Sequence, residues 1–303
     1  MELHHLWLFH KVAKNLSFTK AARELYLSQP TVSVQINKLE KAIGLKLFEK
    51  NGKNLCLTQC GQLVHSYTKN IFSLIAEMES EINLLKGEIS GRLSIGASNT
   101  PGIYIIPRII GKFKEKYPGI KTDLRIGGTF DVEKMIIVDQ VDFAVIGGKV
   151  KLPKTFIVEK IIDDSMVMIT SPRNPLARFE FVEPKMLADQ PFITHESTSN
   201  LYNAMKHIYK NDLRVPMNIF MALGSVDSIK HAVMADLGIS IIPMSAAKQD
   251  IDLGLLNVVK IPNCNWKYAY SFVYHKDRNL AVPARMMIKI IKDTIGDIVT
   301  GMQ

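Results

Sequence analysis

Three pairs of neighbouring histidines and acids are the first candidates for chemistry in this chain. The pairs are His195-Glu196, Asp163-Asp164 and His4-His5. A hydrolase needs a nucleophile, a base and an orienting group, and neither Gly-x-Ser-x-Gly nor His-Glu-x-x-His occurs in the sequence. The two N-terminal histidines lack the supporting cysteines or acids of a metal site. We therefore expect no catalytic residues, no metal and no resident cofactor.

Hydroxyl residues, amides and glycines gather where predicted strands meet predicted helices. Such corners place hydroxyls and free backbone N–H groups at helix N-termini, which attract anions. A small carboxylate or another oxyanion is therefore the ligand that we expect there. The alternative is that each serine or threonine only caps its own helix. The candidate ligand-binding residues are Ser98, Asn99, Thr100, Thr129, Gly147, Gly148, Thr194, His195, Ser197, Ser199, Gly224 and Ser225.

The elements that must position these residues alternate between strand and helix from Gly91 onwards. The predicted strands are Arg92–Ala97, Thr122–Ile126, Val141–Gly147, Ser165–Thr170, Asn218–Ala222, Ile239–Ile242 and Lys267–His275. The predicted helices are Thr100–Tyr117, Phe130–Asp139, Asn200–Asn211, Ser225–Ala235 and Pro283–Asp297. This repetition predicts parallel sheets, with clefts at the C-terminal ends of their strands.

Residues 1–58 predict a different unit, with three helices and a hairpin. Ser17 and Ser28 are the expected N-caps of the second and third helices. The third helix has one apolar face, made by Val32, Ile36, Leu39 and Ile43. Two short apolar runs then bracket residues 51–54, which is typical of a hairpin with an Asn-Gly turn. Together these elements predict a winged helix-turn-helix.

The polar side of the third helix carries residue types that can read DNA bases. Gln29 can bond adenine through two hydrogen bonds, and threonine, valine or proline can contact a thymine methyl group. Lysines and the first hydroxyls of the second helix are expected to bind phosphates. The full set of expected DNA contacts is Ser17, Thr19, Gln29, Pro30, Thr31, Ser33, Val34, Asn37, Lys38, Lys50 and Lys53.

Positive charge is densest at the N-terminus. Residues 1–60 hold nine Lys or Arg against four Glu, which leaves +5 of the chain's net charge of +9. The isoelectric point is near 9.3. This balance favours a polyanionic partner such as double-stranded DNA, although a basic face can also be merely solvated.

Residues 59–87 predict one long linker helix. Apolar residues recur along it at spacings of three and four, at Leu63, Tyr67, Ile71, Leu74, Met78, Ile82 and Leu85. A single exposed helix cannot bury such a stripe, so pairing with a second copy of the chain is expected. The alternative is that the helix lies on the core of its own chain.

Cysteine usage and the N-terminal segment point to the cytoplasm. Cys56, Cys60 and Cys264 have no metal-site spacing and are expected to be small buried or half-buried residues, rather than redox sensors. The chain starts without a signal-peptide pattern, and no run approaches 18 apolar residues. We expect a cytoplasmic protein without membrane contacts.

Two stretches resemble the LysR-type transcriptional regulator family. The first comprises Ser17–Leu25, Leu27–Glu40, Gly44–Glu49, Leu57, Thr58 and Gly61, in register with the family's helix-turn-helix. The second comprises Gly96–Ser98, Gly102, Pro107, Phe113, Tyr117, Pro118, Asp142–Ala144, Ser171, Pro172, Pro175–Ala177, Gly224, Ser225, Leu237–Ile239 and Pro243. These residues resemble the family's effector domain, which has the periplasmic-binding-protein fold.

The resemblance implies an α+β multi-domain architecture. It comprises a winged helix-turn-helix, a linker helix and a two-lobed α/β effector domain. Lobe I would comprise residues 88–161 and 267–303, and lobe II residues 162–266. The chain would cross between the lobes near Ile161–Asp164 and return near Pro262–Trp266.

The resemblance also implies a function. A homodimer formed through the linker helix, assembling further into a homotetramer, would bind an interrupted inverted-repeat operator. A small effector between the lobes would change DNA bending and the contact with RNA polymerase.

One departure from the family pattern affects DNA recognition. Val34, Lys50 and Lys53 stand where the family often has arginine. Lysine is a point charge and lacks the planar fork of arginine, so phosphate contact by the wing is better supported than insertion into the minor groove.

Two other classes of protein remain as alternatives. A solute-binding module or an enzyme built on the C-terminal lobes would need a secretion signal or a catalytic set, and the sequence has neither. A sequence-indifferent architectural DNA binder would show no preference for its own upstream DNA at moderate salt.

Overall fold

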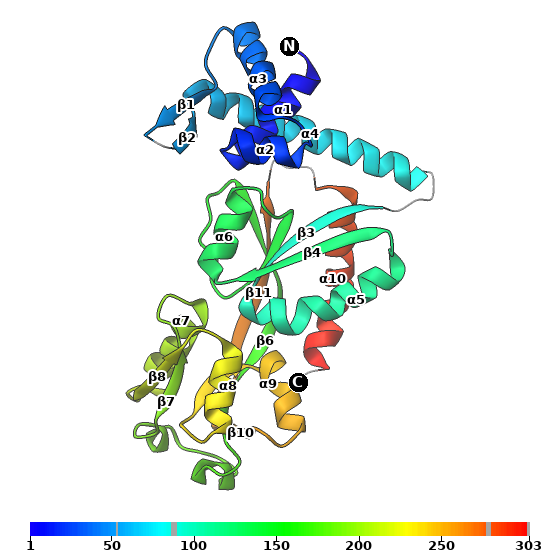
Figure 1. The fold of residues 1–303 in the computed structure, drawn as a ribbon. Helices are drawn as coiled ribbons and strands as arrows, with labels where there is room; N and C mark the ends of the chain where they lie inside the picture. Colours follow the sequence, from blue (N-terminus) through cyan, green and yellow to red (C-terminus); the bar gives the residue numbers. More distant parts are fainter. Residues whose placement is uncertain (53, 86–89, 277–279, 302–303) are drawn as a thin grey trace. The chain divides into compact units, whose positions relative to one another are not determined.

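The computed structural model describes residues 1–52, 54–85, 90–276 and 280–301 of the protein. Contacts between residues divide the chain into two compact units, Met1–Ile82 and Asn83–Gln303. Figure 1 shows a helical first unit and a second unit built around strands. Among the described residues, no helix combines the length and the apolar character that crossing a membrane requires.

The first unit begins with three helices, and the second and third start directly after the predicted N-caps. They are α1 (Leu3–Asn15), α2 (Phe18–Glu24) and α3 (Gln29–Ile43). The hydroxyl of Ser17 accepts a hydrogen bond from the Lys20 N–H, and that of Ser28 from the Thr31 N–H. Both predicted N-caps are therefore confirmed. Gly44 ends α3 in the left-handed conformation at φ +80°, which costs glycine little.

The core of the first unit joins α1, α2 and α3. Ala21 and Ala22 are buried, and their small side chains let α2 lie close to its neighbours. The apolar face of α3 is buried as predicted, except that Ile43 is half-buried. In α1, Leu8, Phe9 and Val12 are buried, whereas Leu3 is 52% exposed.

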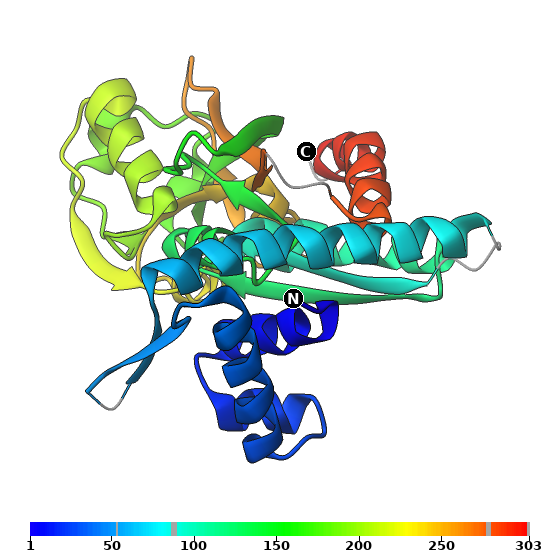
Figure 2. The ribbon, with the colours of Figure 1, turned by 90° about the horizontal axis from the view of Figure 1, so that it is seen from above.

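The predicted hairpin is present, with a tighter turn than expected. Strands β1 (Phe48–Asn51) and β2 (Asn54–Leu57) pair antiparallel, and Asn51 lies opposite Asn54. Because of this pairing, Asn51 belongs to the ladder and not to the turn, and Gly52 is the first turn residue after it. Gly52 has φ +63°, in the left-handed region that favours glycine. The hairpin projects from the helices of its unit (Figure 2).

The long helix α4 (Gln59–Leu85) has two different apolar faces. Val64, Ile71 and Phe72 pack against the core of the first unit, so part of the helix does lie on its own chain, and the prediction of Ile71 in the exposed stripe was wrong. The exposed side is a separate stripe, formed by Leu63, Tyr67, Leu74, Met78 and Ile82, each between 42% and 63% exposed. We call these five residues the α4 stripe. Leu85, which was also predicted in the stripe, is the last residue of α4, and its side chain lies outside the described part of the chain.

The second unit contains a seven-stranded mixed sheet. Its strands are β3 (Gly91–Ser98), β4 (Ile120–Gly127), β5 (Phe143–Gly147), β6 (Phe156–Thr170), β9 (Ser240–Pro243), β10 (Asn257–Val259) and β11 (Trp266–His275). The order is β10-β6-β11-β5-β3-β4, and β9 also pairs with β6. β3 is parallel to β4 and β5, but β6 and β11 are antiparallel to their neighbours. The prediction of parallel sheets was therefore wrong for β6 and β11, because these long strands carry the chain in opposite directions between two lobes.

Each lobe packs helices on its strands. Lobe I contains β3, β4, β5, α5 (Ile106–Lys116), α6 (Thr129–Ile137) and α10 (Val282–Thr300). Lobe II contains β7 (Phe192–His195), β8 (Ile219–Leu223), β9, β10, α7 (Asn200–His207), α8 (Val226–Met234) and α9 (Met244–Asp252). A π-helical turn precedes α5 at Pro101–Ile105, another follows α7 at Ile208–Leu213, and lobe II has short 3₁₀ turns at Pro175–Arg178 and Pro184–Leu187. The sequence prediction lacked β7, β10 and α9.

Candidate DNA-binding surface and ligand cavity

The candidate base-reading residues lie on the open side of α3. Gln29, Pro30, Thr31, Asn37 and Lys38 are exposed. Two more were predicted on this side: Val34 is 53% exposed, whereas Ser33 is half-buried. The N-terminus of α3 therefore presents an amide, a pyrrolidine ring, a hydroxyl and an isopropyl group to solvent. These groups match the hydrogen-bonding and methyl contacts available on base edges.

Two of the expected DNA-contacting hydroxyls already hold a helix start. The Ser17 oxygen accepts the Lys20 N–H at 3.2 Å, which leaves its O–H free to donate to a phosphate. Thr31 shares a 2.7 Å hydrogen bond with the hydroxyl of Ser28. Thr19, by contrast, is exposed beside Ser17. The hydroxyls of Ser17 and Thr31 thus have a structural role that does not prevent contact with DNA.

A buried carboxylate ties the hairpin to α3. Glu40 accepts hydrogen bonds from the N–H groups of Leu47 and Phe48 at 2.9 and 3.4 Å, and its other oxygen pairs with Lys46 at 2.6 Å. Burial raises the pKa of Glu40, but the bond from Lys46 and the two N–H donors outweigh it and lower that pKa. The start of β1, and with it exposed Lys50, is thereby attached to α3. Lys53 lies outside the described residues.

Two features of the first unit were missed in the sequence prediction. Tyr26, in the turn between α2 and α3, is 97% exposed with φ +55°, and its hydroxyl is free to reach a phosphate. Gly61 lets α4 start against the hairpin, because a Cβ there would lie 2.0 Å from the Leu47 carbonyl oxygen. The one feature of the sequence that could have indicated a role for Tyr26 is the presence of an aromatic residue in the short break between the second and third predicted helices.

The second unit has a cavity of about 540 Å³ between its lobes. Seven of the twelve predicted ligand-binding residues line it: Ser98, Asn99, Thr100, Thr129, His195, Ser199 and Gly224. Ten further lining residues were not predicted: Gly127, Gly128, Phe130, Asp131, Glu196, Thr198, Asn200, Leu201, Val226 and Tyr268. The predicted corners of strand and helix therefore do meet at one place.

The other five predicted residues lie outside the cavity lining. Gly147 donates its N–H to the Ser98 hydroxyl at 2.9 Å, and the buried hydroxyl of Thr194 donates to the His195 carbonyl at 3.2 Å. Ser225 caps α8 through the Ser228 N–H. Gly148 and Ser197 are also absent from the lining. Ser225 therefore caps its own helix, as the alternative interpretation of these hydroxyls predicted.

Four helix starts lie at the wall of the cavity. The π-helical turn after Thr100, α6 at Thr129, α7 at Asn200 and α8 at Val226 all begin at its wall. Their unpaired N–H groups and dipoles favour negative charge. Among the described lining residues there is no lysine or arginine, whereas Asp131 and Glu196 contribute carboxylates. An anion would therefore be bound by N–H and O–H groups and not by cationic side chains.

His195 adds a neutral imidazole to the wall. Its side chain is 6% exposed, and its Nδ1 has no hydrogen-bond partner among the described residues. Burial lowers the pKa of His195, although the neighbouring Glu196 opposes this shift. Near neutral pH the ring is thus uncharged and can donate from one nitrogen and accept at the other. A ligand group can satisfy the unpartnered atom.

Side chains of the two lobes meet beside the cavity. The Asn200 amide at the start of α7 donates to the carbonyls of Gly147 and Lys149, at 2.8 Å each. The Tyr104 hydroxyl donates to Asp227 of α8 at 2.7 Å, and the Lys230 ammonium lies 4.9 Å from the Tyr104 ring centroid. A Cβ at Gly148, which has φ +79°, would lie 2.7 Å from the Asn200 Cβ, so the close approach requires glycine. These contacts hold the lobes together around the cavity.

Two family models match the chain. The model described as bacterial regulatory helix-turn-helix protein, lysR family, matches residues 3–62. The model described as LysR substrate binding domain matches residues 86–296.

Relatives with similar sequences are transcriptional regulators by name. A probable RuBisCO transcriptional regulator from Cyanophora paradoxa is 32% identical over 289 residues, covering 94% of this chain and 89% of its own length. The HTH-type transcriptional activator CmpR from a Synechocystis species is 33% identical over 287 residues, covering 94% of this chain and 93% of its own.

Solved structures of regulators have the same fold. A full-length OxyR variant from Pseudomonas aeruginosa has a TM-score of 0.74 at 19% identity, covering 97% of this chain and 94% of that one. The regulatory domain of Synechocystis CcmR, solved in complex with 2-PG, has a TM-score of 0.61 at 22% identity, covering 67% of this chain and 97% of its own.

Proposed function

The chain belongs to the LysR family of bacterial transcriptional regulators, and from this premise we propose how it binds DNA and what controls it. The N-terminus of α3 reads bases in the major groove, and the β1–β2 hairpin contacts the phosphate backbone. A small anionic effector binds in the cavity between the lobes and changes the activity of the promoter. The convergence of four helix starts on this cavity is the observation that supports the effector most directly.

The chemistry of the cavity wall supports a particular kind of effector. A carboxylate or phosphate group fits the helix starts and the hydroxyls of Thr100 and Thr129. Asp131 and Glu196 would repel a second anionic group, so hydroxyl or amino groups on the rest of the ligand are favoured where they face these carboxylates. The complex of CcmR with 2-PG supports placing an effector in a domain of this fold.

The cavity is proposed to bind its ligand without catalysis. Among the described residues, neither Ser98 nor Ser199 is hydrogen-bonded to His195; their oxygens accept backbone N–H groups at 2.9 and 3.0 Å, and the His195 Nδ1 has no partner. A catalytic role would need a hydrogen bond between nucleophile and base. The regulator names of the relatives agree with a binding role.

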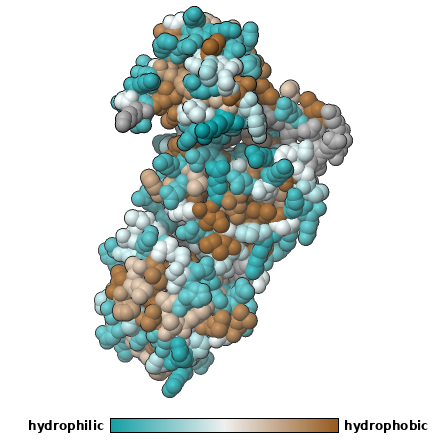
Figure 3. Space-filling model, viewed as in Figure 1, coloured by the Kyte–Doolittle hydropathy of each residue, from teal (hydrophilic) through white to brown (hydrophobic). Residues whose placement is uncertain are grey.

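The active form is proposed to be an oligomer. Pairing of two copies through the α4 stripe would remove its five exposed apolar side chains from water. The second unit also exposes Phe130 and Phe220, at 77% and 59%, and Figure 3 shows hydrophobic surface on its visible face. A homodimer through α4, extended to a homotetramer through the second units, would bind an inverted-repeat operator and contact RNA polymerase. The activator name of CmpR favours activation as the outcome.

Fluorescence anisotropy with two duplexes tests the DNA-binding proposal. One duplex is the DNA upstream of the protein's own gene and the other is a random sequence. We expect Gln29→Ala to weaken binding to the upstream duplex about 5- to 150-fold and to leave random binding unchanged, because it removes only base contacts. Lys38→Ala should weaken both and flatten the salt dependence by about one unit. An equal loss on both duplexes for Gln29→Ala would contradict the reading role of α3.

A thermal-shift screen followed by calorimetry tests the effector proposal. Small carboxylates and phosphates with hydroxyl or amino groups should raise the unfolding temperature, because a ligand stabilises the folded state that it binds. Thr100→Val keeps the shape of a buried residue and removes its hydroxyl, so the Kd of such a ligand should rise at least about tenfold. Thr122→Val, in β4 and outside the cavity, is the matched control. Unchanged affinity in Thr100→Val, or a preference for cationic ligands, would refute the anion site.

A further inference from the structure

A second pocket lies in lobe II, at the far end of the helix that begins at the inter-lobe cavity. It measures about 420 Å³ and is lined by Lys206, Tyr209, Lys210, Arg214, Val215 and Met217. Lys206 is in the last turn of α7, and Tyr209 and Lys210 are in the π-helical turn that follows. The lining is disjoint from that of the inter-lobe cavity, so this pocket is a separate site.

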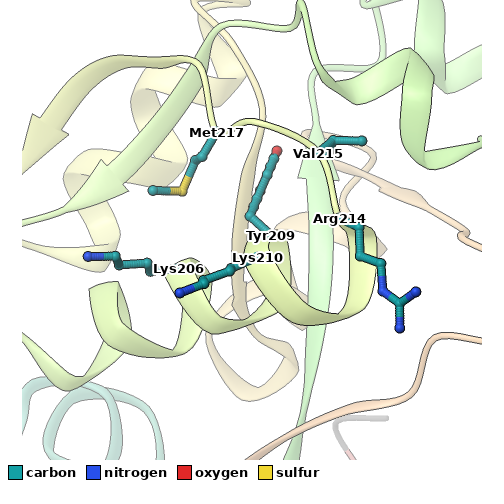
Figure 4. A pocket seen from close by; sticks show the side chains of 6 residues that line it. All are labelled: Lys206, Tyr209, Lys210, Arg214, Val215 and Met217. Carbon is teal, nitrogen blue, oxygen red and sulfur yellow. The ribbon is translucent and has the colours of Figure 1, made fainter.

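The charge of this pocket is opposite to that of the inter-lobe cavity. Its described lining has three cationic side chains and no carboxylate. No ion pair within the described part of the chain neutralises Lys206 or Lys210, and both are exposed. Figure 4 shows these two lysines extending together on one side, while Arg214 points elsewhere. Two adjacent ammonium groups make a local site for a small anion.

A buried hydroxyl in the pocket wall has no partner. Tyr209 is 2% exposed, and its ring is fixed by edge contact with Phe192 at 4.7 Å between centroids. Its hydroxyl has no hydrogen-bond partner among the described residues. Burial raises the pKa of this hydroxyl, so it remains a donor at neutral pH. A buried, unpaired O–H group is unfavourable, and an acceptor atom on a ligand would remove that cost.

Apolar groups complete the lining. Val215 and Met217 are half-buried, and Figure 4 shows the Tyr209 hydroxyl directed towards the segment that carries them. Methionine adapts its flexible thioether to ligands of varied shape and makes favourable contacts with aromatic rings. The pocket therefore combines a cationic side with an apolar wall.

We propose that this pocket is a second effector site, which binds a small organic anion with one carboxylate or phosphate group on a compact apolar body. Lys206 and Lys210 neutralise the anionic group. Val215 and Met217 contact the carbon body of the ligand. Once the flexible Met217 side chain moves aside, the buried Tyr209 hydroxyl donates a hydrogen bond to the ligand. The proposal does not depend on what the inter-lobe cavity binds.

Methyl NMR of the full chain with phenyl phosphate as the probe tests this site. The chain has 14 methionines, and Met217→Leu identifies the Met217 methyl signal as a local reporter. Phenyl phosphate should shift this signal saturably. The Kd should rise at least about tenfold in Lys206→Ala/Lys210→Ala and about three- to tenfold in Tyr209→Phe. Benzyl alcohol, which lacks the charge, should bind at least about tenfold more weakly than phenyl phosphate.

A matched double variant controls for loss of charge. Lys185→Ala/Lys260→Ala removes two exposed cations of lobe II outside the pocket and should leave the Kd unchanged. The proposal is overturned if the Met217 signal does not saturate, or if the pocket variant and the control variant bind phenyl phosphate equally. It is also overturned if benzyl alcohol binds as tightly as phenyl phosphate. Far-ultraviolet circular dichroism of each variant checks that the chain is folded.

Discussion

At the scale of single residues, hydroxyls at helix starts divide into two groups. Ser17, Ser28, Ser199 and Ser225 each accept an N–H from the first turn of the helix that they precede. Thr100 also precedes a helical turn, but its side chain makes no capping bond. Its hydroxyl is therefore available to a ligand. Hydroxyl side chains at helix starts thus have two roles. Those that accept an N–H cap the helix, and one that makes no capping bond can bind a ligand.

One residue of the first unit should make its stability depend on pH. His10 lies on α1 and faces α4, with its ring centroid 5.4 Å from that of His65 and 5.5 Å from that of Phe72. Burial, with a further contribution from His65 and nearby lysines, lowers the pKa of His10 from 6.5 to about 4. Its Nδ1 is buried and has no hydrogen-bond partner in the described chain. The folded protein thus keeps this ring neutral at a pH where the unfolded chain protonates it.

We predict that acid destabilises the first unit partly through His10. Between pH 6.5 and 4 the unfolded state binds a proton that the folded state does not, so the free energy of unfolding falls as pH falls through this range. Urea unfolding of the wild type and of His10→Phe between pH 7.5 and 4.5 measures the effect. Protonation of Glu24 and Glu40, whose pKa values are lowered in the folded state, also reduces the free energy of unfolding as pH falls. This contribution is the same in both proteins, so the difference between their pH profiles isolates His10. Parallel pH profiles for the two proteins would contradict the prediction.

At the scale of elements, α4 shows how one helix supports two contacts. Its inner face completes the core of the first unit, and the α4 stripe lies on another side. An unpaired stripe of five large side chains is unfavourable in water. The same element therefore stabilises its own unit and presents a surface that suits a second copy.

We predict that charges in the α4 stripe separate the oligomer. Leu74→Glu/Met78→Glu places two carboxylates at side chains that are 53% and 55% exposed, so the chain should still fold while its association weakens at least about tenfold. Sedimentation velocity measures the mass of the particle. Gln62→Glu adds a carboxylate to an exposed position of α4 outside the stripe and should leave the mass unchanged. A wild type that sediments as a monomer, or a double variant with wild-type mass, would refute pairing through the stripe.

At the scale of the whole molecule, the connection between the two lobes of the second unit matters most. In the second unit, β6 and β11 are the covalent connections between the lobes, and Asn200 and Tyr104 add side-chain contacts near the cavity. One buried apolar cluster also includes residues of both lobes, Ile105 and Val226 among them. An effector would shift an equilibrium between two arrangements of the lobes only by its difference in affinity for them.

The local features of the first unit followed from the sequence alone. The two serine caps, the hairpin, the buried face of α3 and most of the stripe of α4 all depend on residues within one or two turns of one another, so spacing along the chain predicted them. In the second unit the same reasoning found most strands and helices, and seven residues that line the cavity. Its main errors were the direction of β6 and β11 and the omission of β7, α9 and β10.

Only the tertiary structure decided which distant residues share a site. Asn200 bridges to Gly147 across 53 positions of sequence, and Tyr268 reaches the cavity from the returning strand β11. Periodicity along the chain also does not specify the neighbours of the Asp131 and Glu196 carboxylates or of the unpartnered Tyr209 hydroxyl. Those neighbours determine what each group can bind. Spacing determines which face of an element is apolar. The packing of one element on another determines which polar groups are left to bind a ligand.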